Sequence, residues 1–270
     1  MGSALAQPEV VAALMPAVLG KWESLRDDER ALIPCTECLS ALVGALGPQF
    51  LPFVEPLYGR IMRLVHARTA ALATPELEEP DFDWPCVSLD LLSAMLESFG
   101  PQMAPLLESS GGVALIVQAA GIDPETEMKR VLFACLGDLA KNCWELLAPH
   151  AQALLPMLLH HFNPFCEPPR TAGTLFIGRR SASVRADIAA CNNATWAVGE
   201  IVSRLGAEGA DTAFLGSVVA KIESWLKEPR RYHKTILDSS SVALARCDSQ
   251  AANTRCHADV PSSFCCSDVS

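Results

Sequence analysis

The sequence predicts an all-α fold, a HEAT-repeat solenoid of about five helical hairpins. Its 270 residues are 50% hydrophobic but only 6% aromatic, and this balance, rich in Leu, Ala and Val, favours helix. Apolar residues recur at helical spacing in segments that come in pairs. The pairs also resemble one another: Leu39-Ser40-Ala41 followed by Gly47-Pro48-Gln49 returns as Leu92-Ser93-Ala94 followed by Gly100-Pro101-Gln102.

We expect repeats over residues 1–163 and again over residues 188–247. A two-helix unit cannot bury its apolar face alone, so stacking of the units forms the core. The predicted pairs are Pro8–Trp22 with Ala31–Leu46, Leu51–Arg68 with Phe82–Phe99, Met103–Ala120 with Glu125–Trp144, Leu147–Phe162 with Ala190–Leu205, and Asp211–Leu226 with Lys234–Cys247.

Two segments break the helical pattern. Residues 164–187 contain Pro168-Pro169 and several arginines, and they form a predicted irregular, basic insertion loop. Residues 248–270 are rich in Ser, Ala and Asp without an apolar period, and we expect a disordered tail. The Cys and His residues of this tail fit no known metal-site spacing.

Composition and missing motifs narrow the function. The net charge of −10 argues against nucleic acid and favours basic partners. The apolar stretches are interrupted by Pro, Gly or charge, so we expect no membrane partner. Cys35 and Cys38 form a CxxC without a second ligand pair, which predicts no metal site. No phosphate-binding loop or hydrolase motif occurs, so the protein is predicted to be no enzyme and to need no cofactor.

Three second helices share one design, with an apolar stripe on one face and acidic or aromatic residues on the other. The polar faces carry Asp90 and Glu97 in one helix, Asp138 in the next, and Trp196 with Glu200 in the third. Stacked in a superhelix, these faces would line one concave wall. Each carboxylate could instead simply solvate its helix. Trp196 favours a contact site, because a large aromatic side chain is unusual on a polar face.

The stretch from Cys191 to Ile201 (CNNATWAVGEI) resembles the matching stretch of the transportins, nuclear import receptors of the importin-β superfamily. Further stretches of the chain also match the transportins, and they occur in the same order along both sequences. Together the matches cover about residues 12–163 and 188–247. They are Leu25–Arg30, Glu37–Ser40, Phe50–Pro56, Leu89–Ser93, Leu136–Leu139 and Lys234–Leu237.

The resemblance implies a right-handed HEAT superhelix that shuttles between cytoplasm and nucleus. Such receptors bind proline-tyrosine nuclear localisation signals, whose N-terminal half is basic or hydrophobic, and Ran-GTP releases them. Carried over by position, the acidic cargo contacts fall on Asp90, Glu97 and Asp138. The apolar contacts fall on Ile188, Trp196 and Val242. We expect the carboxylates to capture a basic segment, and an apolar or Arg side chain to be buried against Trp196.

The chain departs from the transportin pattern in three ways. The repeats that would bind Ran-GTP and the Pro-Tyr dipeptide have no counterpart here, residues 164–187 are an insertion, and the chain after Cys247 does not match. Nucleoporins remain possible partners. An alternative function is that of a HEAT scaffold subunit in a cytosolic assembly without transport activity; salt-dependent binding would distinguish the two.

Overall fold

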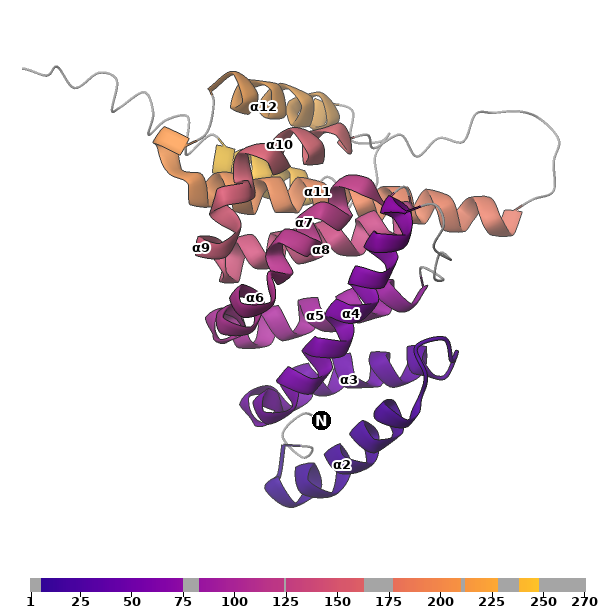
Figure 1. Ribbon diagram of the computed structural model, residues 1–270. Helices are drawn as coiled ribbons and strands as arrows, with labels where there is room; N and C mark the ends of the chain where they lie inside the picture. The colour runs from indigo at the N-terminus through magenta and orange to yellow at the C-terminus, as the bar shows by residue number, and fades with distance from the viewer. Residues whose placement is uncertain are drawn as a thin grey trace, which may run out of the picture.

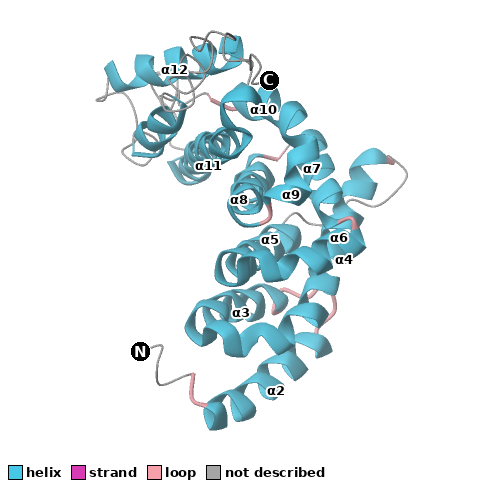
Figure 2. Ribbon diagram, turned by 90° about the vertical axis from the view of Figure 1, so that its left-hand side faces the viewer, coloured by secondary structure: helices cyan, strands magenta, loops and turns pink. Residues whose placement is uncertain are grey.

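The computed structural model describes residues 6–74, 83–123, 125–162, 177–209, 212–227 and 238–247, without the side chains of residues 177–185 and 206–212. All regular structure in these residues is helical (Figures 1 and 2). The α-helices are α2 (Pro8–Ser24), α3 (Leu32–Leu46), α4 (Val54–Ala73), α5 (Asp83–Phe99), α6 (Ala104–Ser110), α7 (Gly112–Ile122), α8 (Thr126–Asn142), α9 (Trp144–Leu147), α10 (Ala151–His160), α11 (Ile177–Gly209), α12 (Thr212–Lys227) and a last helix at 238–247.

The helices form a curved stack of two layers. Helices α3, α5, α8 and α11 follow one another along its inner, concave side, while α4, α7 and α10 form the outer layer (Figure 2). Each inner helix packs against the inner helix of the next repeat: α3 on α5, α5 on α8 and α8 on α11. This arrangement confirms the predicted all-α HEAT-repeat solenoid, in which neighbouring hairpins bury one another's apolar faces.

The predicted apolar stripes form the core. In α5, Leu89, Leu92, Met95 and Leu96 are fully buried. The matching positions of α8 and α11 are also buried: Leu132, Leu136 and Leu139 in α8, Cys143 directly after its end, and Val198, Ile201 and Val202 in α11. Helical periodicity therefore predicted correctly which face of α5, α8 and α11 packs into the core.

The repeated Gly-Pro-Gln motifs have a backbone explanation. Gly47 and Gly100 both end an inner helix with positive φ angles, 53° and 51°, a conformation that glycine adopts at little cost. A short 3₁₀ helix follows each one, over Gly47–Phe53 and Gly100–Met103, with proline near its start. The repeated motif thus marks the turn from an inner to an outer helix.

Several predicted helices differ from the observed ones. Met103–Ala120 is not one helix, because Gly111 takes a φ of 65° between α6 and α7. Leu147–Phe162 is likewise divided, by the 3₁₀ turn Ala148–His150 between α9 and α10. The irregular segment predicted at 164–187 is wrong from Ile177 onward, where α11 begins. Residues 163–176 and the predicted tail, 248–270, lie outside the described residues.

The continuous run Leu32–Ala73 is long and apolar enough, by length and composition alone, to cross a membrane, a property that the interrupted apolar stretches did not predict. In the fold, this run is not one helix but consists of α3, the 3₁₀ helix Gly47–Phe53 and α4. Both α3 and α4 pack against α5. Its apolar side chains therefore contribute to the core of the solenoid.

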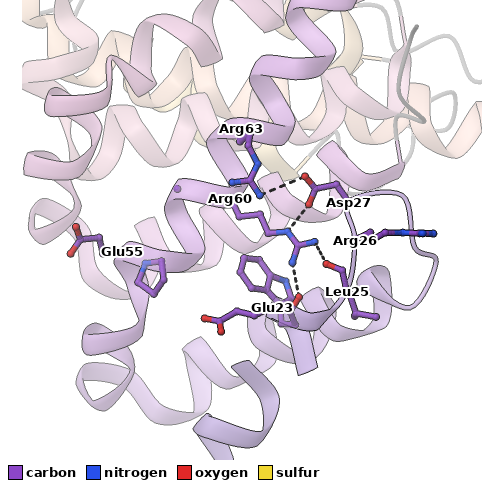
Figure 3. Close-up of a pocket in the computed structure, with 10 residues that line it drawn as sticks. Glu23, Leu25, Arg26, Asp27, Glu55, Arg60 and Arg63 are labelled. Atoms are coloured by element: carbon purple, nitrogen blue, oxygen red, sulfur yellow. Dashed lines mark hydrogen bonds and ion pairs between the residues drawn. The ribbon is translucent and has the colours of Figure 1, made fainter. Parts of the chain in front are cut away.

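Charged side chains connect the outer helices. The guanidinium of Arg60 lies 4.5 Å from the ring centroid of Trp22. It pairs with Asp27 at 2.7 Å and donates to the carbonyl oxygens of Trp22 and Leu25 (Figure 3). Arg60 is 7% exposed, so a buried cation joins α4 to the end of α2. Arg and not Lys suits this position, because three separate acceptors are met by one planar fork.

Candidate functional site

The predicted site residues lie on a surface made by four neighbouring helices, α5, α8, α11 and 238–247, which we call the inner wall. Polar contacts fix how these helices lie side by side. Cys135 in α8 donates to the carbonyl oxygen of Leu89 in α5, with sulfur and oxygen 3.4 Å apart. Asn193 in α11 donates to the carbonyl oxygen of Arg130 at 2.8 Å. Ser239 in the last helix donates to the amide oxygen of Asn192 at 2.7 Å.

Asp138 occupies the centre of the inner wall. It is 8% exposed, and burial raises the pKa of its carboxyl group to about 6. A hydrogen bond with Ser93 of α5 opposes this shift, whereas the neighbouring carboxylates of Glu97 and Glu200 add to it. Lys141 offsets only part of the effect. A carboxylate desolvated among like charges gains stability when a cation approaches, which is the expected property of a site for a basic side chain.

Trp196 lies beside Asp138, because its indole ring packs on the backbone of Gly137. Its Nε1–H donates to Oε1 of Glu200 at 3.0 Å. Glu200 is itself only 7% exposed and pairs with Arg246 of the last helix, at 2.7 Å between Oε1 and Nη1. The indole is therefore part-buried and held by a polar partner at its edge.

Asp90 is paired within the chain. Arg130 of α8 lies 3.4 Å from its carboxylate and also pairs with Glu127 at 2.9 Å. Burial raises the pKa of Asp90 even though Arg130 lowers it. The Asp90 side chain is still 46% exposed, so a ligand can reach it, but its charge is already partly balanced.

The inner wall brings the predicted residues together to different degrees. Glu97, Asp138 and Trp196 form its centre, and Asp90 lies two helical turns from Glu97 along α5. Ile188 is partly buried against the core, two turns before Trp196. Val242 is 50% exposed, and among the residues whose side chains the structure describes only Ile122 is another exposed large apolar residue.

Arg130 and Arg246 were missed by the sequence reasoning. Each one pairs with a carboxylate in a different hairpin, and the periodicity of a single helix carries no signal for such a partner. The only available indication was their position on helices that also carry predicted site residues.

Two pockets lie among the described residues away from the predicted site residues on the inner wall. One, of about 530 Å³, lies at Trp22, Arg60 and Arg63 near the first repeats (Figure 3). Another, of about 310 Å³, is lined by Lys129, His160, His161 and residues around Ala190. Within the part of the chain that the structure describes, no group of three His, Cys, Asp or Glu residues could hold a metal ion. Burial also raises the pKa of the Cys35 thiol, which argues against a reactive CxxC.

The sequence of the chain is similar to those of several known proteins. No family model matches it. It is 33% identical over 251 residues to transportin-1 of Mus musculus and 32% identical over the same length to transportin-1 of Homo sapiens. It is 27% identical over 251 residues to importin subunit beta-2 of Schizosaccharomyces pombe. The chain spans about a quarter of the length of these relatives. Over 91% of its length, it is thus a homologue of the transportin and importin beta-2 proteins.

Proposed function

We propose that this chain binds nuclear localisation signals on its inner wall and acts in protein import into the nucleus. Its relatives are transportins and importin subunits, which are transport receptors and not enzymes. The bound segment would be the basic or hydrophobic N-terminal part of a proline-tyrosine signal. The contacts would be Asp90, Glu97 and Asp138 for basic side chains, and Ile188, Trp196 and Val242 for apolar ones.

The observation that carries this proposal is the environment of Asp138. Its carboxylate is buried next to Glu97 and Glu200, and the wall around it is acidic. Folding stability alone does not explain such an arrangement, because like charges held close together in a desolvated place destabilise the fold. A lysine or arginine from a partner would relieve the repulsion.

Binding would proceed in two steps. The acidic wall, on a chain of net charge −10, attracts a basic segment and speeds its capture, more strongly at low salt. Apolar side chains of the segment are then buried against Trp196 and Val242. Each exposed carboxylate would contribute about 0–1 kcal/mol, so loss of Trp196 should cost more than loss of Asp90 or Glu97 alone.

The test is fluorescence anisotropy of a labelled basic proline-tyrosine signal peptide, at low and at physiological salt. The variants are Trp196→Ala and Asp138→Asn. Each has a matched control away from the inner wall: Trp144→Ala on α9, where the indole is also partly buried, and Glu55→Gln on α4, where the carboxylate is exposed.

Salt-sensitive binding that both wall variants weaken, and both controls retain, is the expected result. Equal affinities for all five proteins, in samples shown by circular dichroism to be folded, would place the binding surface elsewhere. Binding that does not respond to salt would favour the scaffold alternative, in which apolar contacts dominate.

The wider role follows from the same proposal. A chain that carries signals into the nucleus would be found in both cytoplasm and nucleus, and in the full-length family Ran GTPase and nucleoporins would be further partners. Fluorescence microscopy of the tagged chain, with and without Trp196→Ala, would test whether this distribution depends on the inner wall.

A further inference from the structure

Glu200 holds a position between two side chains of the inner wall. Its Oε1 accepts a hydrogen bond from the indole N–H of Trp196 at 3.0 Å and lies 2.7 Å from Nη1 of Arg246. The Arg246 contact is an ion pair without hydrogen-bond alignment. Trp196 and Glu200 are one turn apart on α11, whereas Arg246 comes from the last helix, so the pair depends on the stacking of two hairpins.

The last helix is held closely enough for this pair to be fixed. Ala243 lies close to Gly199: a Cβ added at position 199 would be 3.2 Å from the Cα of Ala243. Ala243 and Cys247 are buried, while the Arg246 side chain is 31% exposed at the edge of the wall. Arg246 thus reaches Glu200 from a firmly packed helix.

From these contacts we infer that Arg246 sets the ligand specificity of the inner wall: by holding the Glu200 carboxylate in an ion pair, it makes the surface at Trp196 select an apolar side chain over a basic one. This inference rests on the proposed function of the wall and assigns a role to a residue outside the predicted site. Arg246 is a positioning residue, because it acts through Glu200 and Trp196.

The contrast with Asp138 supports this division of the wall. Among the described residues, no ion pair involves Asp138 or Glu97, whereas Glu200 and Asp90 are each paired with an arginine of the chain. Gly137, which contacts the Trp196 ring, directly precedes Asp138. A basic side chain at Asp138 and an apolar one at Trp196 would therefore come from ligand residues close together in sequence.

Without the Arg246 charge, the surface at Trp196 would change in character. Glu200 would remain as a buried carboxyl group beside an aromatic ring, without its ion pair to Arg246, and such an environment favours a lysine or arginine from a ligand. The exposed Val242, one turn before Arg246, would remain as the apolar part of the surface.

Two labelled peptides test this inference. The first carries a pair of arginines with a leucine two residues away, and the second has a lysine in place of that leucine. The full chain and its Arg246→Gln, Arg246→Lys and Glu200→Gln variants are titrated with both by fluorescence anisotropy at several salt concentrations.

We expect the full chain to prefer the leucine peptide and Arg246→Gln to shift the ratio of affinities toward the lysine peptide by about tenfold. Arg246→Lys keeps the charge and should keep the original preference. Glu200→Gln removes the carboxylate that would attract a lysine, so it should also keep that preference. If Arg246 only supports the fold, Arg246→Gln should weaken the binding of both peptides equally.

An unchanged ratio in Arg246→Gln, with measurable binding of both peptides, would overturn the inference and leave the proposed function intact. Failure of every protein to bind either peptide would instead reject the inner wall as a signal-binding surface, and this inference with it. A charge-dependent ratio that Arg246→Lys restores is the outcome that supports both.

Discussion

The indole ring of Trp196 lies so close to Gly137 that a Cβ at position 137 would be 2.3 Å from ring carbon Cζ3. Glycine is therefore required at this point of α8. The aromatic ring of the next hairpin occupies the space that a side chain at position 137 would need. The same relationship recurs one hairpin later, where Ala243 lies against Gly199. The two glycines stand at corresponding positions of successive inner helices, directly before Asp138 in α8 and before Glu200 in α11.

Gly137→Ala should destabilise the chain by about 1–3 kcal/mol, because the new methyl group overlaps the Trp196 ring. This loss would exceed the gain of up to about 1 kcal/mol that alanine brings to a helix interior. The midpoint of urea unfolding measures the change, and the same variant should bind the signal peptide more weakly.

Gly44→Ala is the matched control for this variant. Gly44 lies inside α3, where an added Cβ would meet nothing within 4 Å, so the change should stabilise the chain by about 0.5–1 kcal/mol. Opposite signs for the two substitutions are the diagnostic result. A stabilising effect of both would mean that the Trp196 ring moves freely away from Gly137.

Asp138→Asn should raise stability at neutral pH. The pKa of Asp138 is raised to about 6 in the folded chain from an ordinary value near 3.8, so the folded state holds its proton more tightly. The stability that this proton provides is fully present below about pH 4 and is lost as the pH rises through about 6. At about pH 8 the asparagine variant should be more stable by about 1–3 kcal/mol.

Urea unfolding of both proteins between about pH 4 and pH 8 checks this expectation, and the difference between them should shrink to nothing at the acid end. Loss of signal-peptide binding together with a gain in stability would identify Asp138 as a residue kept for function. A variant less stable at about pH 8 would show that the Asp138 charge supports the fold.

Asp123→Asn should cost about 3–5 kcal/mol, because it removes the negative charge from a buried ion pair whose carboxylate accepts two hydrogen bonds from Arg68. Arg68 Nε lies 2.9 Å from Asp123 Oδ2, and the two side chains are 3% and 1% exposed. The pair joins α4 to the end of α7, within the outer layer. Chemical unfolding measures the cost. The exposed Glu223–Lys227 pair of α12 is the comparison: Glu223→Gln should cost less than about 1 kcal/mol.

His161 should make the chain acid-sensitive. Burial lowers its pKa to about 4, with further effects from Lys129 and His160, and its ring lies 5.0 Å from that of Phe133. Between about pH 6.5 and pH 4 the unfolded state takes up a proton that the folded state refuses, so stability falls as the pH falls. His161→Gln should flatten this part of the curve. A variant whose curve is as steep as that of the unchanged chain would contradict the lowered pKa of His161.

The periodicity of the sequence was enough to predict the stripes that form the core. Leu92 and Val198 are buried because every third or fourth position of a helix faces the same way, which is a local property. The start of α11 at Ile177 was missed, since its first turns carry arginines and serines without an apolar stripe.

Charge pairing across hairpins could not be predicted. Asp138 has the sequence pattern of a surface carboxylate, yet it is buried because α5 and α11 flank it. Arg130 finds Asp90, and Arg246 finds Glu200, only through the register in which separate helices stack. Such contacts depend on the assembled solenoid.

The stacking of hairpins in series has a mechanical consequence. Asp90 and Val242 stand at opposite ends of the inner wall, with α8 and α11 between their helices, so small rotations between successive hairpins add up along that distance. Trp196 and Gly137 are in direct contact and keep their spacing. We expect successive hairpins to bend easily relative to one another. A segment bound along the whole wall should restrict this bending in four hairpins at once.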